Sequence, residues 1–331
     1  TFSGNPAVRM TNQPHREFIY RGAFEMGRHI IGYEVQKVLA AVDWFAAETP
    51  DLPIAVYGYG EGGLLAFYSA ALDERIGTAV VSGYFGPREE LWKEPIYRNT
   101  WALLDEFGDA EIATLIAPRN LVVEYCYYPA VAGPPAPRDG RAGAAPGSLG
   151  TPVQAAVSAE VARALALVDQ LEPQWKLPLI ENPGGYPGTD AALVELLRLV
   201  GSTAHPARSG APPRDLRKGF DPDQRLKRQF DQLMEYTQEL MRDSEFRRAE
   251  FWSKADGGSV EKWRASTRTY RDLLWDEVIG RLPAASVPAN PRARQVFDEP
   301  KYRGYEVVLD VWPDVFAYGI LLVPKDLKPN E

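Results

Sequence analysis

Residues 54–72, IAVYGYGEGGLLAFYSAAL, join an apolar, strand-like run to an apolar, helix-like run through a glycine-rich turn. The four glycines of this turn fit two known patterns. Gly58, Gly60 and Gly63 match G-x-G-x-x-G, the loop that binds the pyrophosphate of a dinucleotide. Gly58, Gly60 and Gly62 match the G-x-S-x-G nucleophile elbow, with glycine in place of the serine. The two patterns predict different chemistry.

The dinucleotide pattern lacks its usual partner in this sequence. It needs an acidic residue about 20 positions further on, which binds the ribose. About that far beyond Gly58 stand Val80, Val81 and Ser82, and none of them carries a carboxylate. A helical pattern at 24–47 also precedes the glycine strand, so this is not obviously a first strand–helix unit. A nucleotide-binding loop stays as an alternative, and we predict no cofactor.

The residues around the turn alternate between strand-like and helix-like segments. Apolar runs predict further strands at 78–86, 121–124 and 177–181. Helical periodicity predicts helices at 24–47, 64–72, 159–171 and 191–200. This order of elements predicts an α/β protein with a parallel sheet and right-handed crossovers. The segment 129–152, rich in Pro, Gly and Ala, predicts a long loop.

Composition excludes several classes of partner. The 331 residues carry a net charge of −8 with no clustered basic face, which argues against nucleic acid as a partner. Cys126 is the only cysteine and the three histidines are scattered, so we predict neither an internal disulfide nor a metal site. No apolar run reaches the roughly 18 residues of a membrane span. No feature of the sequence assigns a compartment.

Three stretches together carry a resemblance to a known family. They are GRHIIGYEVQKVLAAVDWF (27–45), PIAVYGYGEGGLLAFYSAALDERIGTAVVSGYFG (53–86) and LIAPRNLVVEY (115–125). In this order they resemble the α/β-hydrolase superfamily, in particular its acetyl xylan esterase and dienelactone hydrolase-like branch, over residues 21–200. The resemblance implies a partial hydrolase sheet, strands five to eight, with flanking helices. It also implies a small ester or a carbohydrate ester as the substrate class.

The resemblance places the nucleophile at residue 60, where Gly60 has no oxygen or sulfur to attack a carbonyl. It places the acid near Glu124, for which an ion-paired or surface carboxylate is the alternative. Glu61 follows the elbow, and its backbone N–H would be one oxyanion donor. The family's histidine would fall within 181–193, where there is none. His205 in a linker is the nearest candidate base, with a solvated histidine as its alternative.

Beyond residue 200 the sequence changes character. A polar, proline-containing stretch at 201–222 predicts a linker, and an apolar stripe beginning at Leu226 predicts a long helix. The run 305–324, YEVVLDVWPDVFAYGILLVP, predicts a hairpin with its turn at 312–314. The predicted parts are the C-terminal half of a hydrolase-like domain at 1–200, a linker at 201–222, a helical connector at 223–300, and a β-hairpin opening a second hydrolase-like module at 301–331.

These observations lead to a functional hypothesis with one main alternative. We expect both ends to be cuts, so that the chain is an internal segment of a tandem-module protein. The leading hypothesis is an esterase-like pseudoenzyme module, with a degenerate elbow, that scaffolds or binds substrate beside an active carboxylic-ester hydrolase module of the same polypeptide. The alternative is an active ester hydrolase with a non-standard site, in which Glu61 or Glu124 activates water.

Overall fold

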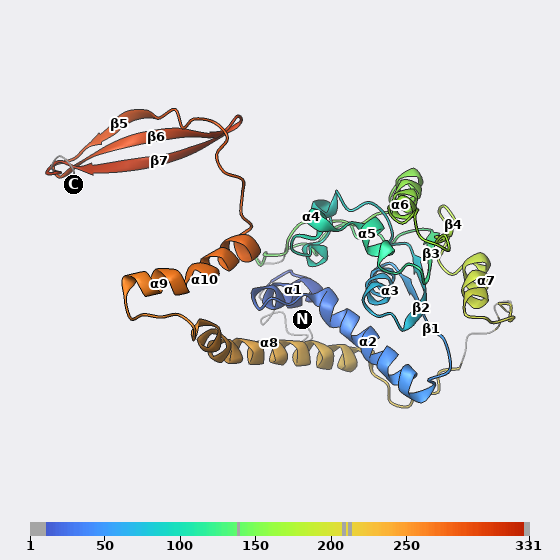
Figure 1. Ribbon diagram of the computed structural model, residues 1–331. Coiled ribbons are helices and arrows are strands. Elements are labelled where there is room, and N and C mark those ends of the chain that lie inside the picture. Colours follow the sequence, from blue (N-terminus) through green and yellow to red (C-terminus); the bar gives the residue numbers. More distant parts are fainter. Residues whose placement is uncertain (1–10, 138–139, 207–209, 211–213, 328–331) are drawn as a thin grey trace. The chain divides into compact units, whose positions relative to one another are not determined.

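The computed structural model describes residues 11–137, 140–206, 210 and 214–327. The chain divides into two compact units, Thr1–Glu245 and Phe246–Glu331. Each unit holds one β-sheet (Figure 1). None of the helices in the described ranges is both long and apolar enough to cross a membrane.

The first unit contains the predicted parallel sheet. Its strands lie in the order β1 (Ile54–Tyr59), β2 (Ile76–Ser82), β3 (Asn120–Tyr125) and β4 (Leu179–Glu181), and every neighbouring pair is parallel. β2 and β3 are buried along almost their whole length, as expected for the inner strands of a parallel sheet covered on both faces. The architecture is therefore α/β, with four strands and flanking helices.

The helices of this unit are mostly those the periodicity predicts. Their bounds are α1 (His15–Glu25), α2 (Ile30–Glu48), α3 (Glu61–Leu72), α4 (Leu103–Glu106), α5 (Asp109–Thr114), α6 (Gln154–Leu167) and α7 (Asp190–Leu199). The segment predicted as one helix at 24–47 is in fact split between α1 and α2. Gly27 adopts φ +64° at the break, and the imidazole of His29 caps α2 by accepting a hydrogen bond from the backbone N–H of Ile31.

The loop after β3 is long, as predicted, and it is tied to the segment before α1. The side-chain amide of Asn12 donates to the carbonyl of Pro135 at 2.6 Å and accepts from the backbone N–H of Ala144 at 3.0 Å. Val131 and Leu149 pair across the base of the loop. These contacts hold the described part of the loop next to the carboxyl ends of β2 and β3.

Helix α8 (Pro222–Trp252) runs through the boundary between the two units, and its Phe230 and Leu233 pack on the first unit's core. The second unit continues with α9 (Val260–Ser266), α10 (Arg268–Leu273) and a short π-helical segment (Leu274–Ile279). Its antiparallel sheet has the order β5 (Arg292–Asp298), β6 (Tyr302–Trp312) and β7 (Val315–Pro324). β6 and β7 form the predicted hairpin. β5 lies in the stretch predicted as a helical connector, at 223–300, and the prediction missed its alternation of Arg292 and Arg294 with Ala293 and Gln295, which is a strand pattern.

Candidate functional site

The turn between β1 and α3, predicted as a nucleophile elbow and called the elbow below, is sharp. Gly60 lies at its corner with φ 57° and ψ −119°, a conformation that L-residues seldom adopt. Its backbone N–H donates to the carbonyl of Ser82 on β2 at 3.0 Å, and its own carbonyl accepts from the N–H of Leu64 at 3.0 Å. The strand therefore turns into the helix within a single residue.

Glycine is favoured at two positions of this turn, because a side chain would collide with the backbone at residue 58 and would be tightly crowded at residue 63. A Cβ on Gly58 would lie 1.9 Å from the carbonyl oxygen of Gly62, and a Cβ on Gly63 would lie 3.0 Å from the carbonyl oxygen of Ser82. Gly62 differs from both, since nothing lies within 4 Å of a Cβ placed there. Close contacts thus explain why residues 58 and 63 are glycine, whereas no contact in this structure explains the glycine at 62.

The space that a nucleophile's side chain would occupy is filled by a proline. A Cβ on Gly60 would lie 2.5 Å from Cγ and 3.1 Å from Cδ of Pro129. Pro129 belongs to the loop that follows β3, so it reaches the elbow from 69 positions away in the sequence. It has no reactive group, and no motif in the sequence pointed to it. Residue 60 therefore carries no reactive side chain, and Pro129 fills the space beside its Cα.

Glu61, a predicted site residue, is engaged in ion pairs. Its carboxylate pairs with Arg16 on α1 and, at 2.6 Å, with Arg98. Burial would raise the pKa of Glu61, but the charges of Arg98 and then Arg16 outweigh it and hold that pKa below its ordinary value. A carboxylate so stabilised in its charged form is a poor general base.

Glu124, the predicted acid, is fully buried in β3 and accepts hydrogen bonds from both strand and loop donors. Thr189 donates through its backbone N–H at 2.9 Å and its hydroxyl at 2.7 Å, and the N–H of Gly188 donates at 3.0 Å. The hydroxyls of Ser82 and Tyr57 complete the set. Burial would raise the pKa of Glu124, but the hydrogen bonds from Ser82, Gly188 and Thr189 lower it further than burial raises it.

The three histidines do not meet at the elbow. His205 is exposed in the segment after α7. His29 caps α2, and its other ring nitrogen lies 3.0 Å from the carbonyl of Asn99. His15 is in α1, where its ring contacts Phe230. The described part of the chain has no group of three His, Cys, Asp or Glu side chains that could hold a metal ion.

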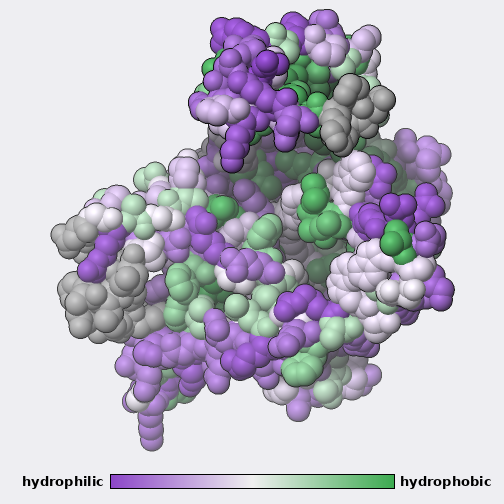
Figure 2. Space-filling view, turned by 90° about the vertical axis from the view of Figure 1, so that its left-hand side faces the viewer, coloured by the Kyte–Doolittle hydropathy of each residue, from purple (hydrophilic) through white to green (hydrophobic). Residues whose placement is uncertain are grey.

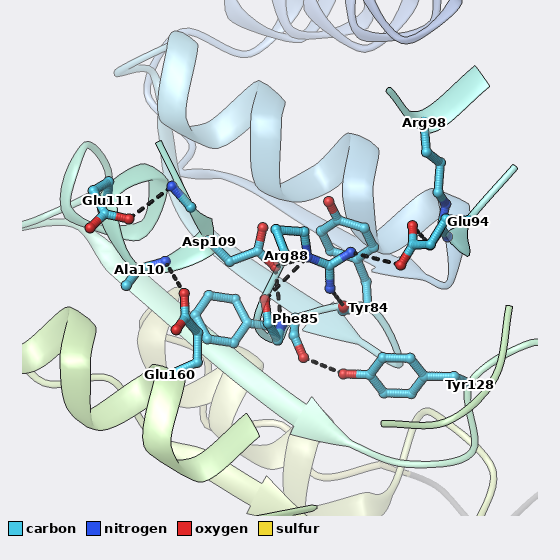
Figure 3. Close-up of polar contacts among 12 residues, drawn as sticks. Tyr84, Phe85, Arg88, Glu94, Arg98, Asp109, Ala110, Glu111, Tyr128 and Glu160 are labelled. Carbon is cyan, nitrogen blue, oxygen red and sulfur yellow. Dashed lines mark hydrogen bonds and ion pairs between the residues drawn. The ribbon is translucent and has the colours of Figure 1, made fainter. Parts of the chain in front are cut away.

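A cavity of about 550 Å³ lies beside the elbow. Pro129 borders it, together with Tyr84, Arg88, Arg98 and Tyr128. Figure 3 shows how these side chains are joined: Glu94 lies between the two arginines, with its carboxylate 3.4 Å from Nη1 of Arg88 and 2.9 Å from Nη1 of Arg98. Both guanidinium groups also stack near the ring of Tyr84. The charges of Arg88 and Arg98 are therefore paired with Glu94 within the wall of the cavity.

Arg88, which lines the cavity, also forms a buried ion pair with Asp109 (Figure 3). The Nε of Arg88 lies 3.3 Å from Oδ2 of Asp109, and that oxygen also accepts from the backbone N–H of Gly86 at 3.1 Å. Nη2 of Arg88 donates to the carbonyl of Tyr84 at 2.8 Å. The other oxygen of Asp109 is buried and has no hydrogen-bond partner among the described residues. The pair thus holds the turn after β2, which forms one side of the cavity.

The two partners respond differently to burial. Burial lowers the pKa of Arg88, but its neighbouring negative charges, Asp109 first, raise it above its ordinary value. For Asp109, burial is the larger effect and raises its pKa to about 6, although the charge of Arg88 lowers it. Desolvation therefore destabilises the charged form of Asp109 more than its attraction to Arg88 stabilises it. We infer that fixed hydrogen bonds, more than net attraction, keep the pair in place.

The Asp109 carboxyl should give the stability of the protein a distinctive pH dependence. Its pKa rises from an ordinary value of 3.8 to about 6, so between these values the folded chain binds the proton and the unfolded chain does not. The contribution of Asp109 to the free energy of unfolding should therefore fall as the pH rises from about 4 to about 6, by about 3 kcal/mol. Urea unfolding of the protein and of Asp109→Asn across this range checks it, because the variant should lack this slope. Equal slopes would contradict it.

No family model matches this sequence, and no curated protein matches it. Two solved structures titled glucuronoyl esterase from Solibacter usitatus show a low likeness to it. One has a TM-score of 0.33 and 12 % identity, covering 53 % of this chain and 48 % of that chain. The other has a TM-score of 0.31 and 14 % identity, covering 50 % and 47 %. The chain thus spans about half the length of each, and likeness at this level assigns no role to any of its residues.

Proposed function

We propose that the first unit is an esterase-like module of the α/β-hydrolase type that has lost its acyl-transfer chemistry. Its role is to scaffold, or to help bind substrate for, an active carboxylic-ester hydrolase module of the same polypeptide. One observation carries this proposal: residue 60 keeps the corner geometry of an elbow, but it is glycine, and Pro129 fills the space of the missing side chain.

The other groups around the elbow support the same function. Every catalytic route through a covalent acyl intermediate needs a nucleophile and a base. The described residues provide neither at this turn. The two nearby carboxylates are not free to act as a base, because Glu124 accepts hydrogen bonds from its donors and Glu61 pairs with its arginines. The backbone N–H of Glu61 remains as an oxyanion donor, and such a donor alone gives only weak catalysis. The cavity beside the elbow would still accept a small ester.

An esterase assay tests the loss of activity. The full chain should release p-nitrophenol from p-nitrophenyl acetate no faster than the Glu61→Gln and Glu124→Gln variants do at matched purity. The Gly60→Ser variant should gain nothing, because it lacks a base and its hydroxyl would meet Pro129. Saturable turnover that one Glu→Gln change abolishes would instead establish the alternative, an active ester hydrolase in which that carboxylate activates water.

The nucleotide-binding alternative has a separate test. The carboxylate of Glu61 stands in the first turn of α3, where a phosphate would otherwise approach the helix N-terminus. A dinucleotide phosphate would have to displace this carboxylate from Arg16 and Arg98. Titration calorimetry with NAD or ATP should therefore show no binding heat, and a micromolar affinity would revive the phosphate-binding interpretation of the glycine loop.

A further inference from the structure

The cavity beside the elbow has two arginines in its wall, which would ordinarily predict a binding site for an anion. A guanidinium group can bind a carboxylate through two parallel hydrogen bonds, and arginine is common where proteins bind carboxylates. Arg88 and Arg98 both line this cavity, and their side chains are only 5 % and 9 % exposed. The charges around the two arginines decide whether they are free to bind an anion.

Glu94 occupies the position that the carboxylate of a ligand would take between these arginines. One of its oxygens, Oε1, lies 3.4 Å from Nη1 of Arg88, and the other, Oε2, lies 2.9 Å from Nη1 of Arg98 (Figure 3). Glu94 also lines the cavity, and its side chain is 22 % exposed. The protein's own carboxylate thus bridges the two arginines within the cavity wall.

Each arginine also pairs with a second carboxylate. Nε of Arg88 lies 3.3 Å from Oδ2 of Asp109, and Nε of Arg98 donates to Oε1 of Glu61 at 2.6 Å. These second partners hold the guanidinium groups independently of Glu94. If the charge of Glu94 were removed, both arginines would therefore stay in place, and the Nη1 atom of each would lose its charged partner.

The other lining residues offer no unpaired cation. Lys93 and Glu90 are both exposed and pair with each other. Glu89 is an exposed carboxylate with no ion pair among the described residues. The lining residues 148–153, SLGTPV, include no charged side chain. An anion that entered the cavity would therefore lose its hydration without meeting a free positive charge, which is unfavourable.

An uncharged ester avoids this cost. Its carbonyl needs a hydrogen-bond donor, and Ser148 and Thr151 bring hydroxyl groups to the lining. Pro129, Leu149 and Val153 supply apolar surface for the rest of the ester. On the face of the molecule shown in Figure 2, hydrophobic residues are interspersed with hydrophilic ones, so an ester leaves water more fully inside the cavity than on such a surface.

We propose that Glu94 sets the charge selectivity of the cavity: it neutralises Arg88 and Arg98, so that the cavity takes uncharged esters and rejects esters that carry a carboxylate. This inference rests on the substrate-binding part of the proposed function. Replacing Glu94 by an uncharged residue should turn the two arginines into a site for the carboxylate of a ligand, which would take the place of the lost charge.

Two esters that differ only in charge test this selectivity. Methyl p-carbamoylbenzoate and methyl p-carboxybenzoate have nearly the same shape, and only the second is an anion at neutral pH. NMR titration of the full chain should show that the carbamoyl ester binds roughly tenfold more tightly than the carboxy ester. In the Glu94→Gln variant, the carboxy ester should bind roughly tenfold more tightly than it binds the unmodified chain, while the affinity for the carbamoyl ester should stay nearly the same.

Two further variants separate the role of Glu94 from a general change of charge. Glu195→Gln is the matched control, because Glu195 is 23 % exposed, pairs with Arg198 and does not belong to the cavity lining. It should leave both affinities unchanged. Glu94→Asp keeps the charge, so it should still reject the carboxy ester.

The possible failures are distinguishable. If the unmodified chain binds the two esters equally, or if Glu94→Gln does not strengthen binding of the carboxy ester, the selectivity proposed for Glu94 is wrong and the proposed function still stands. If the unmodified chain binds neither ester, the substrate-binding part of the proposed function is wrong, and this inference is overturned with it.

Discussion

The Gly58→Ala variant is expected to be strongly destabilised, with a large fall in its urea unfolding midpoint. An added Cβ would lie 1.9 Å from the carbonyl oxygen and 2.3 Å from the carbonyl carbon of Gly62. Both are backbone atoms in the first turn of α3, so they cannot move aside without opening the elbow. Clashes of this kind belong to the most destabilising class of substitution, at about 4 kcal/mol or more, against a total stability of about 5–15 kcal/mol for a typical domain.

Urea unfolding followed by tryptophan fluorescence measures this effect, with Gly62→Ala as the matched control. Position 62 lies four residues along the same turn, in α3, with open space around its Cβ. Alanine there should leave the midpoint unchanged or raise the stability by up to about 1 kcal/mol, because it favours the helix. If Gly58→Ala were as stable as Gly62→Ala, the close approach of β1 and α3 at the elbow would be disproved.

The second large effect is expected at the buried pair of Arg88 and Asp109. Arg88→Met removes the guanidinium and leaves Asp109, which is 0 % exposed, without its charged partner. Loss of one member of a buried pair costs about 3–5 kcal/mol. The double variant Arg88→Met with Asp109→Leu should recover most of this loss, since apolar residues of similar volume often replace a buried pair without net cost.

A double-mutant cycle on the free energy of unfolding checks this prediction. The coupling between the two positions should be large, because they share one site and one set of hydrogen bonds. Arg217→Ala removes an arginine from an exposed pair with Asp215 and serves as the control, which should leave the unfolding midpoint unchanged. Additive effects of Arg88→Met and Asp109→Leu would show that the two side chains do not act as a pair.

The sequence was enough to predict the elements around the elbow. The glycines at 58–63 predicted a sharp strand-to-helix turn, and four apolar runs predicted the four parallel strands, because these signals are local. Glu124 was predicted at the end of a strand by the same reasoning. Its loop donors were not predictable, since Gly188 and Thr189 lie 64 and 65 positions further on and carry no distinctive motif of their own.

The contacts that decide the chemistry of the site come from distant parts of the chain. Pro129 meets the elbow from the loop after β3, and Arg16 meets Glu61 from α1. Neither residue type indicates such a role by itself. Strand β5 was missed for a different reason: its seven residues are all exposed, so no buried apolar face marks it, and its arginines pair with carboxylates on the distant β6. The roles of Glu61, Glu124 and His205 stay predictions.

The backbone of Gly60 has a consequence for how such a module changes over evolutionary time. A side-chain-bearing residue held at φ 57° stores about 1–3 kcal/mol of conformational strain, which an enzyme retains because its reaction depends on it. Glycine adopts this corner without that strain. Under the proposed loss of acyl-transfer chemistry, the exchange of a reactive residue for glycine at this corner would relieve that strain and stabilise the fold. Because Pro129 fills the space beside residue 60, restoring a side chain there would require a second substitution at position 129.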